Sequence, residues 1–365
     1  MAIYILQKLG YALLTLFGVV TVIFLLFTIL PGDPARMMLG QNETAEQLAV
    51  VKKKYGFDQP VYVQYLRYLN DLSPVSFHSK NPDDYTFLAE AVPAGRQGKY
   101  NATDLFSVGN TTLVLKTPYL RESFQKNGKE VSEVIAETLP NTVILAVSAI
   151  VIAIFIGVFL GIISVLFKDG FVDKMIQLVS TLGMSVPSFF SAIIFAWIFG
   201  FMLHKYTNLN MTGSLYEVDD FGNGKYIQWK NLILPAIVLG IRPLAVVSQL
   251  MRNSLLEVLN QDYIRTAKAK GLSFYQIIKR HALKNSLNPV VTAISGWFAS
   301  MLAGAVFVEF IFGWNGLGKE IVNALNTLDL PIIMGAVIVI ATLFIIINIF
   351  VDIIYGWLDP KISRQ

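Results

Sequence analysis

The polar residues with chemical potential gather in one stretch, residues 255–289, which lies between two long apolar runs. Its sequence is LLEVLNQDYIRTAKAKGLSFYQIIKRHALKNSLNP. The cationic side chains within it are Arg265, Lys268, Lys270, Lys279, Arg280 and Lys284. A basic helical segment with an apolar side is typical of a surface that meets either a protein partner or a lipid headgroup layer. The stretch therefore indicates binding.

The other polar residues show no arrangement that indicates catalysis or a metal site. The three histidines, His78, His204 and His281, are scattered and lack the spacing of metal ligands. The segment GNGKY at 222–226 lacks the earlier glycine of a phosphate-binding loop and the Ser or Thr after Lys225. No Ser/His/Asp or paired-carboxylate pattern stands out. We therefore expect a chain that is not an enzyme and binds no metal or cofactor.

The residues of the basic stretch predict two short helices joined at a glycine. Asp262 can cap the first helix, which runs through YIRTAKAK and ends at Gly271, the residue type best suited to a left-handed C-terminal position. Ser273 can cap the second helix, and Gln276 three residues later completes a capping box. The apolar side of the pair consists of Ile264, Ala267, Ile277, Ile278 and Ala282. Docking on a protein and binding to anionic lipid both fit this pattern.

The composition of the whole chain is that of a membrane protein. Of its 365 residues, 54% are hydrophobic and only 15% are charged, and the mean hydropathy is +0.56. Soluble domains average about 45–50% apolar and about 25% charged residues. The chain has no cysteine, which excludes disulfides and thiolate metal sites.

Six apolar runs are long enough to cross a hydrocarbon core, which needs about 20 helical residues. They cover residues 9–30, 142–167, 177–203, 231–251, 289–312 and 332–357. The first lacks a small-residue cleavage site, so we interpret it as a retained span. The pattern predicts an all-α polytopic membrane protein with about six transmembrane helices.

The basic residues outside the spans predict the orientation, because short cytoplasmic loops are rich in lysine and arginine. With the N-terminus inside, the inner segments carry Lys8, Lys168, Lys174, the basic stretch, Lys361 and Arg364. The short outer loops carry only Lys205, Lys225, Lys230 and Lys319. We therefore predict that both termini and residues 255–289 face the cytoplasm.

The first external segment is long and polar. Thr44 with Gln47 fits a capping box near its start. Residues 73–128 form an insert that is rich in turn-forming residues, with β-prone runs such as TTLVLK, and its fold and role stay open. The predicted organisation is an N-terminal segment with the first helix at 1–30, an enlarged extracytoplasmic region at 31–141, and a core membrane domain at 142–365 with five helices and the cytoplasmic loop 255–289.

Several features within the spans suit a packed bundle with a central pathway. Pro187 and Pro243 are expected to interrupt the third and fourth spans. Gly296 and Gly304 are expected to allow close helix approach. Arg242 lies near the middle of the fourth span, where an arginine costs about 2.5–3.5 kcal/mol on translocon scales. It either lines a substrate pathway or is satisfied by loop carbonyls.

The segment YIRTAKAKGLSFYQIIKRHALKNSLNPVV closely resembles the EAA loop of permease subunits from bacterial ABC importers of the di- and oligopeptide class. Other segments are similar to the same family in the same order: TILPGDPA, YGFDQPVYVQYLRYL, VIAETLPNT, FVEFIFGWNGLG and VDIIYGWLDPKIS. The residues at 265–267 and 281–284 depart from the generic EAA pattern and follow its peptide-class variant. Asn315 stands where the family usually has proline, and Glu309 and Asp352 match family positions where helix-end packing or capping is the expected role.

The resemblance implies a type I ABC importer permease fold and half of a translocation pathway for peptides or similar small solutes across the bacterial inner membrane. It also implies that the loop forms a coupling helix that sits in a cleft of an ATPase subunit. The implied coupling residues are Asp262, Tyr263, Arg265, Thr266, Ala267, Lys268, Ala269, Gly271, Leu272, His281 and Leu283, and the candidate pathway residues are Arg242 and Pro243. The implied partners are a second homologous permease, two ATP-binding cassette subunits that carry ATP and Mg, an extracytoplasmic solute-binding protein and membrane lipid, with no nucleic acid.

Two other classes of function are considered. An ion-coupled secondary transporter would show inverted repeats and charged residues near the midplane, of which only Arg242 qualifies. A membrane-anchored external domain for sensing or scaffolding would need fewer spans. The substrate stays open, because permeases of this type also carry nickel, glutathione and certain sugars.

Overall fold

The computed structural model describes residues 2–29, 33–39, 44–81, 84–87, 102–126, 128–218 and 224–358. The chain forms two compact units, each described by itself. Unit 1 comprises Met1–Lys8, Thr138–Val322 and Ile340–Gln365, and unit 2 comprises Leu9–Glu137 and Asn323–Val339. The predicted domain boundaries at residues 30 and 141 separate segments by the side of the membrane on which they lie. The two units are instead defined by packing contacts, so the predicted boundaries stay a prediction.

Unit 2 contains most of the first apolar helix and the short helices that follow it. These helices are α1 (Ala2–Ile29), α2 (Pro34–Leu39), α3 (Ala45–Tyr55) and α4 (Val61–Leu72). The predicted capping box at the start of α3 is confirmed, because Thr44 and Gln47 exchange side-chain and backbone hydrogen bonds. This cap satisfies two amide groups that the first turn leaves free, so it fixes where α3 begins.

The core of unit 2 joins α1 and α4 to the start of α16 (Leu330–Leu358). Phe24 of α1 stacks on Tyr68 of α4 with 5.6 Å between ring centroids, and Ile338 of α16 belongs to the same apolar cluster. Just before α16, Asp329 accepts hydrogen bonds from the Ser123 hydroxyl and from the Phe124 amide at 3.1 Å. Segments that are far apart in the sequence therefore complete one core.

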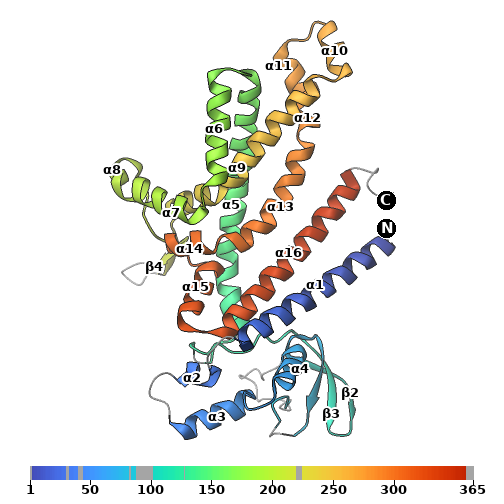
Figure 1. Cartoon of the computed structure of the whole chain (residues 1–365), viewed down its shortest axis with the longest axis vertical. Helices are drawn as coiled ribbons and strands as arrows, with labels where there is room; N and C mark the ends of the chain where they lie inside the picture. The colour runs from blue at the N-terminus through green and yellow to red at the C-terminus, as the bar shows by residue number, and fades with distance from the viewer. Residues whose placement is uncertain are drawn as a thin grey trace. The chain divides into compact units, whose positions relative to one another are not determined.

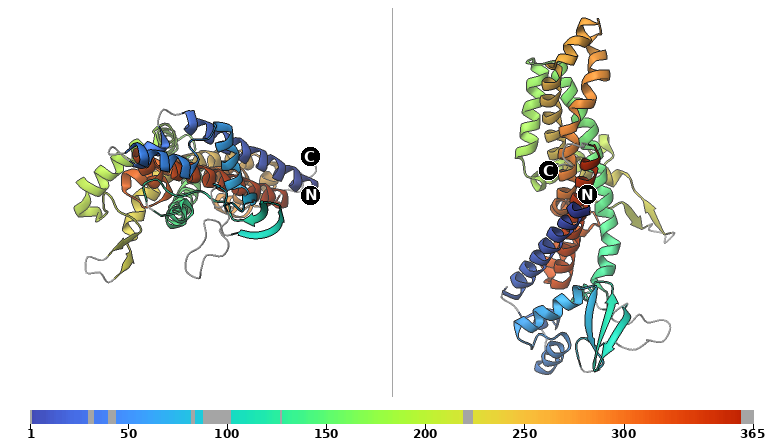
Figure 2. Two further views of the ribbon diagram at one scale, coloured as in Figure 1. Left: turned by 90° about the horizontal axis from the view of Figure 1, so that it is seen from below. Right: turned by 90° about the vertical axis from the view of Figure 1, so that its right-hand side faces the viewer.

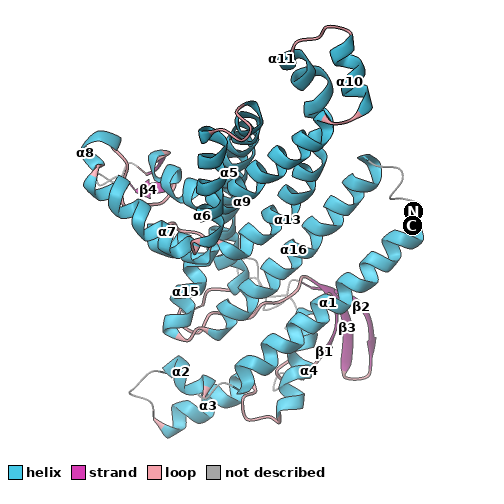
Figure 3. Cartoon of the chain, turned by 45° about the horizontal axis from the view of Figure 1, so that its top comes forward, coloured by secondary structure: helices cyan, strands magenta, loops and turns pink. Residues whose placement is uncertain are grey.

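Part of the insert at 73–128 folds as a three-stranded antiparallel sheet in the order β1-β3-β2 (Figure 3). Its strands are β1 (Val75–Ser79), β2 (Ala102–Val108) and β3 (Thr111–Lys116). The predicted β-prone run TTLVLK is β3, and residues 82–83, 88–101 and 127 of the insert lie outside the described residues. A hairpin in unit 1 pairs β4 (Tyr216–Val218) with β5 (Lys225–Ile227). The fold is thus helical with two small sheets.

Unit 1 is a bundle of long helices around α9 (Lys230–Leu259). The helix α9 packs against α6 (Phe171–Ser185) and α13 (Asn288–Gly304), and α5 (Val131–Leu166) runs alongside (Figures 1 and 2). A Cβ atom at Gly161 of α5 would lie only 2.6 Å from Cβ of Met251, so glycine permits this close approach.

Close helix approach was predicted at Gly296 and Gly304, whereas the close approach described above occurs at Gly161. No described atom would lie within 4 Å of a Cβ at Gly296, so the prediction of a close approach there is wrong. The surroundings of Gly304 lie outside the described part. Outside the basic stretch and the later part of α16, unit 1 also contains α7 (Ser188–Phe195), the π-helix η1 (Ala196–Met202), α8 (His204–Thr207), α14 (Val306–Phe312) and most of α15 (Leu317–Thr327).

By length and composition, the described part of the chain contains four helices that could span a membrane, or six spans if two bent helix pairs are included. Four single helices are long and apolar enough, namely Gln7–Thr28, Val131–Leu166, Lys230–Leu259 and Leu330–Val351. Two further pairs qualify if each bent pair is one span, Phe171–Ser185 with Ser188–Met202 at 109° and Asn288–Leu302 with Val306–Phe312 at 57°. The predicted number of about six is reached only with the bent pairs.

The prolines act differently from one another. The predicted break at Pro187 is confirmed, because α6 ends at Ser185 and α7 begins at Ser188. The predicted break at Pro243 is wrong, since α9 continues through both Pro235 and Pro243. A proline removes only one ladder hydrogen bond, and packing on both sides of α9 holds the rest of the helix.

The helix α5 begins earlier than the span predicted at 142–167. Its first turns bury Val131, Val134 and Ile135, whose spacing of three and four residues is that of one helix face. Apolar run length alone finds the part of a helix that crosses lipid and misses such an amphipathic extension.

Candidate coupling site

The basic stretch forms a helical hairpin beyond the ends of α9 and α13 (Figures 1 and 3). Its elements are α10 (Asp262–Ala269), α11 (Phe274–Ile277), the π-helix η2 (Ile278–Ala282) and α12 (Leu283–Ser286). The prediction of two short helices joined at a glycine is confirmed. The second helical segment consists of α11, the π-helix η2 and α12 in succession.

Two of the three predicted caps in this hairpin are confirmed. Gly271 has φ of +77° and open space around its Cβ position, so its backbone conformation alone explains the glycine. Ser273 and Gln276 form the capping box. Asp262 is not the cap of α10, because Gln261 holds that position and Asp262 is the first helical residue. There its negative charge still interacts favourably with the helix N-terminus.

The apolar side of the hairpin packs against α9. All five residues predicted to form this side are buried. Ile264, Ala267 and Ile277 belong to one cluster with Met251 and Leu255 of α9. A helix that lies on lipid must present its apolar face to the acyl chains. The burial therefore disfavours lipid binding as the role of this segment.

The polar side of the hairpin faces outward. Of the predicted coupling residues, those exposed are Asp262, Tyr263, Arg265, Thr266, Lys268, Ala269 and Gly271; those half-buried are Leu272, His281 and Leu283; and Ala267 is buried. The Asn285 amide donates a hydrogen bond of 2.9 Å to the Tyr263 hydroxyl, which ties α10 to the residues after the π turn. The hairpin is thus a fixed scaffold that displays cations and hydrogen-bonding groups.

An ionic cluster at the base of the hairpin was not predicted from the sequence. The Arg252 guanidinium of α9 donates to both carboxylate oxygens of Asp173 in α6, at 2.8 and 2.7 Å. Asp173 also accepts hydrogen bonds from the Ser164 hydroxyl, the Asp169 amide and the Gln177 amide group. The cluster fastens α5, α6 and α9 together, and α9 leads directly into α10.

The candidate pathway residues lie on α9, apart from the hairpin. Arg242 is exposed on unit 1, and its Nη2 atom donates a hydrogen bond of 3.3 Å to the Met184 carbonyl near the end of α6. Pro243 is buried. Met184 lies within α6, so the acceptor is a helix-end carbonyl and not the loop carbonyl of the second alternative, and a role in a pathway stays a prediction.

The turn after the fifth span is held by a buried carboxylate. Oε2 of Glu309 accepts hydrogen bonds from the amides of Gly318 at 2.7 Å and Lys319 at 3.2 Å, so the expected capping role is confirmed. The Asn315 amide donates a hydrogen bond of 3.1 Å to the Ser214 hydroxyl, which a proline could not do. The side chain of Asp352 lies outside the described residues.

Comparison with known proteins decides the family. The profile described as "Binding-protein-dependent transport system inner membrane component" matches residues 153–364, and its N-terminal companion matches residues 1–80. The chain belongs to this family. This permease is therefore a multi-pass transport component of the inner membrane, and the hypothesis of an ion-coupled secondary transporter is disfavoured.

Curated relatives match the permease over its full length. The dipeptide transport system permease protein DppB of Alkalihalophilus pseudofirmus is 32% identical, with 100% of both chains covered. The di/tripeptide transport system permease protein DppB of Pseudomonas aeruginosa is 32% identical with 99% of both covered, and the dipeptide permease DppB of Bacillus subtilis is 30% identical with 100% of this chain and 98% of that protein covered.

Proposed function

We propose that this permease forms half of the translocation pathway of an ATP-driven importer for short peptides. In this proposal both termini and residues 255–289 face the cytoplasm, as the distribution of lysine and arginine predicts. The hairpin docks in a cleft of a separate ATPase subunit, which binds ATP and Mg. The peptide substrate is supported by the names of the full-length relatives, which are dipeptide and di/tripeptide permeases.

One observation carries the coupling role. The hairpin buries its apolar side on α9 and exposes a rigid polar side, so it can transmit force without changing its own fold. The Asp173–Arg252 cluster fixes α9 to α6 below it. A push on the hairpin would then move these helices as one body, which is the requirement of an alternating-access mechanism.

The proposed complex contains further subunits. A second homologous permease supplies the other half of the pathway, two ATP-binding cassette subunits supply energy, and an extracytoplasmic solute-binding protein delivers the peptide. Lipid surrounds the spans. Co-purification of the tagged permease from its native host, followed by identification of bound subunits by mass spectrometry, tests this composition.

Substitutions in the hairpin test the coupling role. We expect Gly271→Ala to impose a left-handed backbone on alanine at a cost of about 1 kcal/mol or more, which distorts the turn between α10 and α11. Arg265→Ala removes an exposed cation. Both variants should reduce ATPase co-purification and the uptake of a labelled dipeptide. Gly296→Ala is the matched control, because its Cβ meets no described atom. If both hairpin variants retain ATPase association and uptake, the coupling role is wrong.

The buried apolar side has a consequence for this docking. The exposed side of the hairpin carries cations such as Arg265 and Lys268 beside the aromatic rings of Phe274 and Tyr275. We expect the association with the ATPase to weaken as salt rises to the extent that these cations contribute, because the Debye length falls from about 10 Å at 0.1 M to about 3 Å at 1 M. A salt titration of ATPase binding measures this.

Arg242 is a candidate for the pathway. We expect Arg242→Ala to impair dipeptide uptake while the complex still assembles, because among the described residues the exposed guanidinium is held by a single hydrogen bond, to the Met184 carbonyl. Normal uptake by an assembled variant would exclude the pathway role.

A further inference from the structure

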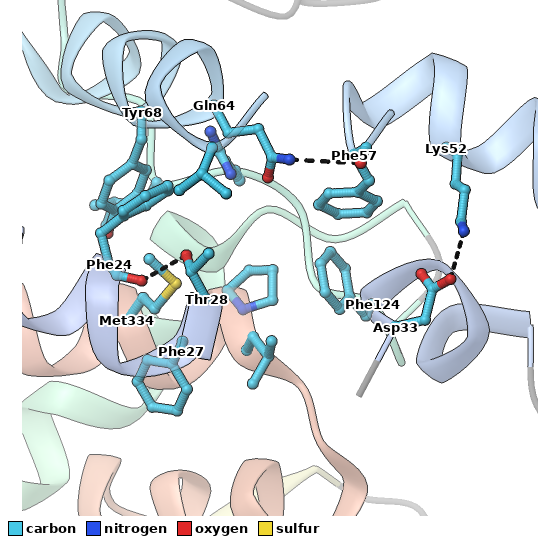
Figure 4. Close-up of a pocket in the computed structure, with 15 residues that line it drawn as sticks. Phe24, Phe27, Thr28, Asp33, Lys52, Phe57, Gln64, Tyr68, Phe124 and Met334 are labelled. Carbon is cyan, nitrogen blue, oxygen red and sulfur yellow. Dashed lines mark hydrogen bonds and ion pairs between the residues drawn. The ribbon is translucent and has the colours of Figure 1, made fainter. Parts of the chain in front are cut away.

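Unit 2 contains a cavity of about 380 Å³ where α1, α3, α4 and the start of α16 meet (Figure 4). This volume lies within the range of small-molecule sites, which span about 300–1,000 Å³ and combine apolar walls with a few polar groups. Phe57 and Phe124 form part of the wall, with ring centroids 6.1 Å apart in an edge-to-face arrangement. The cavity is distinct from the coupling hairpin and from Arg242, which belong to unit 1.

Charged groups lie at two separate places in this cavity. The Lys52 ammonium pairs with the Asp33 carboxylate at 2.5 Å. Figure 4 shows this pair on the opposite side of the cavity from Tyr68, with Phe124 between them in the view. The Arg121 guanidinium lies 4.9 Å from the centroid of the Tyr68 ring. The cavity therefore has a cation at each of two places, Lys52 and Arg121, separated by aromatic wall.

Arg121 has unused binding capacity. Its Nε atom donates a hydrogen bond of 3.0 Å to the buried Asp71 carboxylate, and within the described residues no acceptor engages its two Nη nitrogens. The side chain is 22% exposed and lines the cavity. Its backbone φ of +69° is one that residues other than glycine seldom adopt. Such outliers gather at ligand sites, where the surrounding structure holds them.

A second hollow of about 150 Å³ adjoins the first. Phe57, Arg121 and Phe124 line both, and Tyr85 and Tyr119 line only the second. Burial raises the pKa of Tyr119, so this phenol stays neutral and acts as a hydrogen-bonding group rather than an anion. The space around Arg121 thus extends beyond a single side chain, with further aromatic wall.

The balance of charge in the larger cavity indicates the ligand. Of the cations that line it, Arg121 is matched by Asp71 and Lys52 is matched by Asp33, so a ligand with a net charge would leave this cavity unbalanced. We propose that this cavity is an accessory binding site for a small zwitterion with an apolar body. Its carboxylate meets the Nη nitrogens of Arg121, its ammonium meets Asp33 beside Lys52, and its apolar body packs on Phe57 and Phe124. A free amino acid and a short peptide both have this chemistry.

The site stands on unit 2 alone. It holds whether or not the chain couples to an ATPase, and it differs from the translocation pathway that the proposed function requires. A failure of ATPase association or uptake would therefore leave this site untouched, and a failure of binding here would leave the coupling role untouched.

The test measures binding to the full-length permease in lipid nanodiscs by isothermal titration calorimetry. The probes are leucyl-phenylalanine, free leucine, N-acetyl-leucyl-phenylalanine and leucyl-phenylalanine amide. We expect saturable binding of leucyl-phenylalanine with affinity at least about tenfold above that of the acetylated and amidated forms, since each lacks one charge-assisted hydrogen bond. The comparison with leucine decides whether a peptide or an amino acid is preferred. Absence of saturable binding by both zwitterions overturns the proposal.

Variants assign the binding to this cavity. Val61 lines the cavity and is exposed at the start of α4, so Val61→Trp fills the space and leaves every charged pair in place. We expect it to abolish binding, whereas Val50→Trp, on the exposed face of α3, should bind as the wild type does. Asp33→Asn should weaken leucyl-phenylalanine about tenfold and leave the acetylated peptide unchanged. Wild-type binding by Val61→Trp would overturn the assignment, as would an equal loss for both peptides in Asp33→Asn.

Discussion

The two units each contain a buried aspartate paired with an arginine, and the two pairs are built differently. In unit 1 Arg252 meets both oxygens of Asp173, whose side chain is 1% exposed. In unit 2 only Nε of Arg121 meets Asp71, and its Nη nitrogens have no acceptor among the described residues. A bidentate pair uses the whole guanidinium fork, whereas a single contact leaves most of it available.

The backbone conformations of the two arginines also differ. Arg252 lies in the regular helix α9, while Arg121 lies outside helix and strand with φ of +69°. The pair in unit 1 fastens three helices, and the pair in unit 2 holds an arginine at the edge of a cavity. Similar residue types thus serve packing in one unit and recognition in the other.

The largest expected effect on stability comes from breaking the Asp173–Arg252 pair of unit 1. Asp173→Asn removes the charge that Arg252 faces, and loss of one partner of a buried pair costs about 3–5 kcal/mol. Denaturant unfolding of the permease in detergent micelles should show this loss. The control Asp169→Asn changes a neighbouring exposed carboxylate and should stay within about 0.5 kcal/mol of the wild type. A loss below about 1 kcal/mol for Asp173→Asn would remove the distinction between the two pairs.

A smaller difference in stability is expected between two variants of Arg121, and it reports the strain of the backbone apart from the loss of the side chain. Arg121→Ala and Arg121→Gly both remove the guanidinium, but only glycine adopts a φ of +69° without strain. We expect the glycine variant to be more stable than the alanine variant by about 1 kcal/mol, measured by the same unfolding experiment. Equal stabilities would mean that the backbone at this position carries no strain.

The smallest expected effect is the response of unit 2 to acid. Burial would raise the pKa of Asp33, but hydrogen bonds from Lys52 and from the Ala35 amide outweigh it and lower the pKa. A lowered pKa stabilises the fold above the ordinary value of about 4, and this contribution is lost as pH falls through the folded-state value. Because both side chains are partly exposed, we expect only about 0.5 kcal/mol. The loss below pH 4 should be absent in Asp33→Asn, and an equal acid response in that variant would contradict the assignment.

Local features of the fold were predictable from the residues. Thr44 with Gln47 and Ser273 with Gln276 predicted capping boxes, and Gly271 predicted a left-handed turn, because each depends only on residues within one helical turn. The break at Pro187 was predictable for the same reason, but its bend of 109° was not, since neighbouring helices set the direction of the chain after a break.

Long-range features were not predictable. Asp173 and Arg252 are 79 residues apart, and no local pattern marks them as partners. The same limit applied to Arg121, whose left-handed backbone is imposed by its surroundings and not by its type. For Pro243 the proline rule predicted a break that the packing of α9 overrides. The basic face of the hairpin was visible in the sequence, whereas the packing of its apolar face on α9 required the structure.

The contact of Asp329 with the loop at Ser123 has a consequence for the order of events during synthesis. These residues are 206 positions apart, and unit 2 comprises Leu9–Glu137 together with Asn323–Val339. The ribosome must therefore make nearly all of unit 1 before the last part of the unit 2 core exists. Until then the apolar faces of α1 and α4 lack their partner from α16. Completion of the unit that begins the chain is thus a late step, and translation that stops before residue 323 leaves it unfinished.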